Sequence, residues 1–108
     1  VSVWFFVLNQ IFETTPAEHD TAMETIQART HAALMAFALA AADVPEPFGT
    51  PIYDSLRELA DEFLSGTPRV YADIQTTFDG AEDVAAAAED VATADAETFE
   101  RLYRDARE

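Results

Sequence analysis

The stretch Val44-Pro45-Glu46-Pro47-Phe48-Gly49-Thr50-Pro51 decides the fold that we predict for this 108-residue chain. Proline has no backbone N–H to donate, and it biases the preceding residue away from helical dihedral angles. A helix therefore cannot continue through these residues. Alanine-rich segments with apolar residues at helical spacing lie on both sides of the break. The sequence predicts an all-α protein, a helical hairpin or small helical bundle with a Pro-Gly turn near residues 44–51.

Three Thr-Pro pairs mark helix starts, at residues 15–16, 50–51 and 67–68. Threonine is a favourable N-cap, and proline at the first helical position gives up no hydrogen bond. In Thr15-Pro16-Ala17-Glu18 the glutamate is also placed to reach back to the cap amide and complete a capping box.

Apolar residues at steps of three and four predict the helices that follow these starts. We expect a first helix over residues 16–42, a second from residue 51 with an interruption at 65–68, and a last helix over 81–107. Asp95 falls on the apolar face of the last helix, either as a boundary position of the bundle or as a recognition residue.

Residues 1–12 are strongly apolar but too few to span a bilayer, and they lack the basic start and cleavage site of a signal peptide. The spacing of the apolar residues suits a helix face, whereas residues 3–7 alone suit a strand. We favour a short helix that packs on the bundle, and a non-native start also stays open. Residues 13–108 are expected to form a single helical-hairpin domain. The apolar run at residues 32–42 is mostly alanine and is interpreted as a buried helix face, so we expect no membrane insertion.

Charge and composition exclude several classes of protein. The formal net charge is -15, lysine is absent, and all six cationic side chains are arginines. Such a surface repels nucleic acid and anionic lipid, because binding to phosphates needs cations. The chain has no cysteine, which excludes disulfides and thiolate metal sites. The acidic surface is typical of a solvated, salt-adapted protein, or it is a docking surface for a basic partner.

Residues that could carry chemistry are few. His19 and His31 lie on one predicted helix and are interpreted as surface groups, although His19, Asp20 and Glu24 could form a weak cation site. Phosphate-binding glycine loops, a nucleophile elbow and the Glu-x-x-His spacing of di-iron bundles are all missing from the sequence. We therefore expect no enzyme activity, no catalytic residue, no cofactor and no metal.

Three segments together resemble a known family. Residues 12–16 look like its lead-in to the first helix, Pro47-Phe48-Gly49 lies at its turn, and the alanine-rich residues 85–96 look like the end of its second helix. The family is that of the type VII secretion substrates of actinobacteria, the Trp-x-Gly superfamily, and especially its EspC-like branch. Phe48 stands in place of the usual Trp, and Gly49 matches.

The resemblance implies a non-catalytic hairpin that pairs with a helical protein, as a homodimer or a heterodimer. It also implies that Phe48, Gly49, Val91 and Asp95 recognise the partner. Val91 occupies the Tyr position of the family's Tyr-x-x-x-Asp/Glu export signal, four residues before Asp95, so a partner would carry that signal. The chain would then be cytoplasmic before export and secreted without a signal peptide.

Two other functions stay open. The absence of lysine also suits a stand-alone, cytoplasmic acidic helical domain of a halophilic organism, with an unspecified binding role. A small helical enzyme or metal-binding bundle is the third, and stoichiometric metal binding by the purified chain would favour it.

Overall fold

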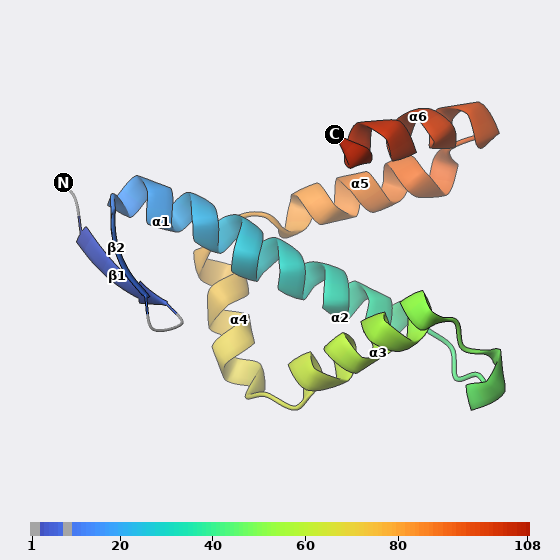
Figure 1. Cartoon of the computed structure of the whole chain (residues 1–108), viewed down its shortest axis with the longest axis horizontal. Helices are drawn as coiled ribbons and strands as arrows, with labels where there is room; N and C mark the ends of the chain where they lie inside the picture. Colours follow the sequence, from blue (N-terminus) through green and yellow to red (C-terminus); the bar gives the residue numbers. More distant parts are fainter. Residues whose placement is uncertain (1–2, 8–9) are drawn as a thin grey trace.

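The computed structural model describes residues 3–7 and 10–108, and it confirms an all-α protein of the small-bundle type (Figure 1). The elements in chain order are β1 (Val3–Val7), β2 (Gln10–Thr14), α1 (Pro16–Met23), the π-helix η1 (Glu24–Arg29), α2 (Thr30–Ala40), the 3₁₀-helix η2 (Glu46–Phe48), α3 (Pro51–Leu64), α4 (Pro68–Thr77), α5 (Ala81–Thr93) and α6 (Ala96–Arg107).

The long helix formed by α1, η1 and α2 is the centre of the fold, and α3, α4 and α5 pack against it (Figure 1). It begins as predicted, because the Thr15 hydroxyl accepts a hydrogen bond from the Glu18 N–H at 3.1 Å. The Glu18 carboxylate accepts from the Thr14 hydroxyl at 3.2 Å. The helix ends at Ala40, two residues before the predicted end.

The π-helical turn η1 is where α4 and α5 meet the long helix. The Thr30 hydroxyl donates to the Thr25 carbonyl at 3.1 Å, five residues back along the chain. From α4, the Gln75 side-chain amide donates to the Ala28 carbonyl at 2.8 Å. Ala28 itself is fully buried. A π turn often marks a site of special packing in a helix, and here it is the junction of the bundle.

Gly80 allows α5 to start directly against η1. Its φ of 135° lies in a region that L side chains rarely adopt. A Cβ at this position would also lie 2.9 Å from both the Glu24 carbonyl oxygen and the Arg29 Cγ. The Gly80 N–H donates to the Glu82 carboxylate at 3.3 Å, so the acidic first turn of α5 covers its own helix start.

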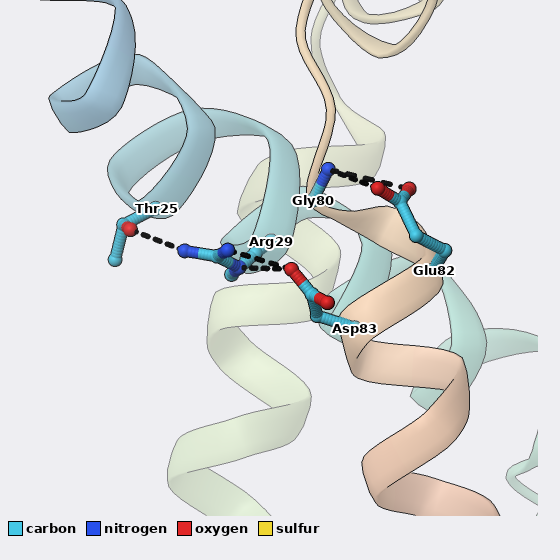
Figure 2. Close-up of polar contacts among 5 residues, drawn as sticks. All are labelled: Thr25, Arg29, Gly80, Glu82 and Asp83. Carbon is cyan, nitrogen blue, oxygen red and sulfur yellow. Dashed lines mark hydrogen bonds and ion pairs between the residues drawn. The ribbon is translucent and has the colours of Figure 1, made fainter.

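An ion pair links α5 to the long helix beside this junction (Figure 2). The Arg29 guanidinium donates to Asp83 Oδ2 from Nη2 at 2.6 Å and from Nε at 3.2 Å. Its remaining nitrogen, Nη1, donates to the Thr25 hydroxyl at 2.7 Å. The carboxylate raises the pKa of Arg29 above its ordinary value, mainly through the side-chain hydrogen bond.

The predicted turn over residues 44–51 is present, and it reverses the chain so that α3 returns along α2. The Thr50 hydroxyl caps α3 by accepting from the Tyr53 N–H at 3.2 Å. Phe37 and Tyr53 then meet across α2 and α3, with ring centroids 6.2 Å apart. Thr67 and Pro68 begin α4 as predicted, although the Thr67 side chain makes no capping bond.

The N-terminal segment corrects the prediction of a short helix. Where the structure describes residues 1–12, the backbone forms β-strands: β1 pairs with β2 in an antiparallel ladder that sets Val3 opposite Thr14 and Val7 opposite Gln10. All five residues of β1 are β-branched or aromatic. Such residues favour a strand over a helix, because a helix restricts their side-chain rotamers.

The last predicted helix is in fact two helices. α5 ends at Thr93, and α6 begins at Ala96. Asp95 separates them as the N-cap of α6, with its Oδ1 accepting from the Thr98 N–H at 2.8 Å. Aspartate is a strong N-cap because its carboxylate satisfies an unpaired amide and complements the helix dipole.

The fold is open and its core is small. Within residues 13–108, whose side chains the structure describes, the fully buried apolar residues are Ala28 and Ala60. The accessible surface is 8556 Å². A compact monomer of this mass would expose about 5,900 Å². The radius of gyration is 16.8 Å, against about 13 Å for a compact chain of this length. A large apolar surface is therefore left uncovered.

Candidate functional site

An apolar groove lies between α2, α3 and α4, with a volume of about 520 Å³. We call it the α2–α3–α4 groove. Its apolar lining includes Met35, Leu39, Phe63, Leu64, Tyr71 and Ala72. Met35, Leu39 and Leu64 are exposed, and Leu39 keeps 76% of its surface accessible. The groove forms because α3 returns along one side of α2 while α4 turns away toward η1.

Three rings from three helices form an aromatic cluster at one end of the groove. His31 of α2 lies 5.1 Å from the Phe63 ring of α3 and 4.8 Å from the Tyr71 ring of α4, between ring centroids. Phe63 and Tyr71 are 4.5 Å apart. A Cβ on Gly66 would lie 2.6 Å from Tyr71 Cε2, so glycine is what allows the α3–α4 connection to approach that ring.

His31 corrects its interpretation as a surface group. Its Nδ1 is buried and has no hydrogen-bond partner in the structure. Burial disfavours the charged imidazolium, which lowers the pKa of His31 below its ordinary value. The ring is therefore neutral at neutral pH, and it contributes both apolar carbon atoms and polar nitrogen atoms to the groove. A buried polar atom without a partner is costly, and a bound molecule could satisfy it.

The electrostatics of the groove differ from those of the rest of the chain. α2 carries no charged side chain except titratable His31, and in α4 Arg69 pairs with Asp73 at 3.0 Å. α3 carries four carboxylates and one arginine, whereas α5 carries four carboxylates and no cation. The residues that line the groove include no carboxylate and no arginine, so the groove is a nearly neutral, apolar surface.

The four residues predicted to recognise a partner lie outside the groove. Phe48 ends η2 and is 77% exposed, and Gly49 follows it with its N–H bonded to the Glu46 carbonyl at 3.1 Å. Val91 is exposed in the last turn of α5, and Asp95 caps α6. Thr98 lowers the pKa of Asp95 through side-chain and backbone hydrogen bonds. Recognition by these four residues stays a prediction.

At the weak cation site proposed for His19, Asp20 and Glu24, His19 Nδ1 lies 3.5 Å from Asp20 Oδ1. The described part of the chain has no group of three His, Asp or Glu side chains placed to hold a metal ion. It also has no helix with the length and apolar character needed to cross a membrane.

The groove was missed from the sequence because the run at residues 32–42 predicted a buried helix face. In the structure Met35 and Leu39 are exposed. Helical periodicity identifies which residues share a face, but it does not tell whether another helix of the same chain covers that face. The sequence has more apolar residues than its own few helices can bury, and this excess was the signal that could have indicated an exposed groove.

Comparison with protein-family models, with curated proteins and with solved structures finds no match for this chain. A functional assignment therefore has to come from the geometry of the groove and from the open fold around it.

Proposed function

We propose that this chain is a non-catalytic helical protein whose function is to bind a helical partner through the α2–α3–α4 groove. The observation that carries the proposal is an exposed apolar groove in a chain whose small core leaves many apolar residues unburied. Amphipathic helices commonly bind by laying an apolar face into a groove of this kind. Contiguous exposed apolar patches are a common feature of interaction sites in soluble proteins.

The chemistry of the groove favours binding over catalysis. Besides His31, its polar side chains are those of Tyr71 and Gln75, and the Gln75 amide is engaged with the Ala28 carbonyl. The lining residues include no carboxylate, serine, threonine or cysteine for His31 to activate. The groove therefore offers contact area and at most one unsatisfied polar atom to its occupant.

A role in type VII secretion is the narrower form of this proposal, and it rests on the sequence resemblance. Phe48, exposed at the turn, is available to a partner in the way that the resemblance implies. Val91 and Asp95 are separated by the end of α5, so they do not share one continuous helix. An export signal that needs both residues on one helical turn would have to be supplied by the partner.

The proposal is tested by producing the chain alone and together with the proteins encoded beside its gene, and by measuring complexes with native mass spectrometry. Leu39→Glu places a charge in the groove. Ile26→Glu is the matched control, because Ile26 lies on the same long helix outside the groove and is 62% exposed. Both residues are accessible, so neither change is expected to unfold the chain.

We expect the wild-type chain to form a stoichiometric complex with itself or with a helical neighbour. Leu39→Glu should weaken that complex about tenfold or more, which corresponds to about 1.4 kcal/mol, and Ile26→Glu should leave it intact. Equal binding by both variants, or a chain that binds neither itself nor a neighbour, contradicts the proposed function.

A further inference from the structure

We propose that the occupant of the α2–α3–α4 groove is helix α6 of a second copy of this chain, exchanged reciprocally so that each copy places its α6 in the groove of the other. This inference rests on the proposed function and names the partner. Three independent features of α6 support it: its apolar face, its charge and its position in the fold.

The apolar face of α6 is only partly covered in its own chain. Phe99, Leu102, Tyr103 and Ala106 follow the i, i+3, i+4, i+7 spacing by which a helix occupies a groove. Phe99 and Tyr103 are exposed, with their ring centroids 6.5 Å apart. In Figure 1 α6 runs back beside α5, and this arrangement leaves Phe99 46% and Tyr103 57% exposed. An amphipathic helix left partly uncovered in this way is expected to bury its face elsewhere.

The balanced charge of α6 is compatible with binding to a second copy. Two chains with a net charge of -15 repel each other, so a stable contact must avoid their acidic surfaces. α6 balances three carboxylates with three arginines, half of all the cations in the chain. The part of α3 that lines the groove, Phe63 and Leu64, carries no charge, so α6 would contact α3 without repulsion from a carboxylate in the lining. The remaining contact would form with the nearly neutral α2 and α4.

The position of α6 favours binding to the groove of a second copy over binding to the groove of its own chain. In Figure 1, α5 and α6 lie on the opposite side of the long helix from α3 and α4. The Arg29–Asp83 ion pair and the Gly80 junction fix the start of α5 there. To reach the groove of its own chain, α6 would have to detach α5 from the long helix. In a symmetric dimer, no such rearrangement is required.

The uncovered surface is large enough for such a dimer. The chain exposes about 2,600 Å² more than a compact monomer of its mass would. A stable interface of standard size buries about 800 Å² on each partner. Reciprocal exchange of α6 would cover two patches on every copy, the groove and the apolar face of α6.

The experiment combines a groove variant with a helix variant. Leu39→Glu disables the groove, Phe99→Glu disables α6, and Ile26→Glu is the control outside both surfaces. Each purified protein is studied by sedimentation equilibrium from about 1 μM to several hundred μM, a range that brackets micromolar association. Circular dichroism checks that each variant keeps its helices. If Phe99→Glu loses helicity, Tyr103→Glu replaces it, because Tyr103 is more exposed.

We expect the wild-type chain and Ile26→Glu to dimerise equally, and each of the other two variants to associate about tenfold more weakly or worse. An equimolar mixture of Leu39→Glu and Phe99→Glu should form a heterodimer more tightly than either variant forms a homodimer. The reason is that one of its two contacts joins an intact groove to an intact α6. Native mass spectrometry separates these species by mass.

Several results would overturn the inference. Unimpaired dimerisation of Phe99→Glu would mean that α6 is not the occupant, as in a groove-to-groove dimer. A mixture that associates no better than the separate variants would exclude reciprocal exchange. A wild-type chain that stays monomeric throughout the range would also overturn it. If such a monomer still bound a helical neighbour through the groove, the proposed function would survive and only the identity of the partner would be wrong.

Discussion

At the scale of single residues, burial of His31 has an energetic cost that the pH dependence of stability can measure. Its neutral ring packs between Phe63 and Tyr71 with an unpartnered Nδ1, and burial lowers its pKa from 6.5. The unfolded chain therefore binds this proton more readily than the folded chain, and acid favours unfolding. The contribution of the neutral ring is present in full above about pH 6.5 and is lost progressively as the pH falls toward the folded-state pKa.

We expect the free energy of unfolding of the wild-type chain to fall, relative to that of His31→Phe, as the pH is lowered from about 7 to about 5. Urea unfolding at several pH values measures both proteins. Taking the difference between them cancels the titration of the many carboxylates, which are common to both. Parallel pH profiles would mean that His31 does not change its protonation state on unfolding.

Gly80 provides a second test at this scale. Gly80→Ala would combine a φ of 135° with a Cβ 2.9 Å from the Glu24 carbonyl oxygen. We expect a loss of about 1–3 kcal/mol of stability. Gly49→Ala is the control: Gly49 has an ordinary φ of -66°, and its new Cβ would meet only the Asp54 carboxylate, which can move. Equal stability of the two variants in thermal unfolding would contradict the account of the α5 junction.

At the scale of elements, local capping signals predicted helix starts well and helix ends poorly. Thr15 and Thr50 cap the helices that were expected from them, because the cap and its amide lie within three residues of each other. The break at Asp95 was missed, because Val84, Val91 and Phe99 keep helical spacing across it. The strands of residues 3–7 and 10–14 were missed because short apolar runs suit either structure.

The cap at Asp95 leads to a prediction about α6. Asp95→Ala removes the acceptor of the Thr98 N–H, so α6 should lose helicity in its first turn, whereas Asp95→Asn should retain most of it. Amide chemical shifts of residues 96–99 measure this directly. If α6 occupies the groove of a second copy, Asp95→Ala should also weaken dimerisation. Unchanged shifts in Asp95→Ala would show that the cap does not hold the helix start.

At the scale of the whole molecule, net charge governs stability. The chain carries -15 on a body with a radius of gyration of 16.8 Å. Salt screens repulsion between such charges, over about 10 Å at 0.1 M ionic strength. We expect the melting temperature to rise from low salt to about 1 M sodium chloride, the range in which screening becomes strong. A steady fall would indicate that ion pairs such as Arg29–Asp83 outweigh the repulsion.

The arrangement of the helices in the whole molecule explains why the groove could not be predicted from the sequence. The sequence predicted the fold class and the turn near residues 44–51, since both depend on local patterns. The groove depends on where α4 leaves α3, and that is set by the Gln75–Ala28 hydrogen bond, the Gly66 approach to Tyr71 and the π turn. The Gln75–Ala28 hydrogen bond joins residues 47 positions apart, so it has no signature within a single segment.

The central claim is that the α2–α3–α4 groove is the surface by which this chain binds its partner. The chain has two methionines, and Met35 lines the groove while Met23 lies in α1 outside it. We would label both methyl groups with ¹³C and record their NMR signals as the chain associates with itself or with a helical partner. The account predicts that the Met35 signal shifts with association and that the Met23 signal does not. Association that leaves the Met35 signal unchanged would contradict it.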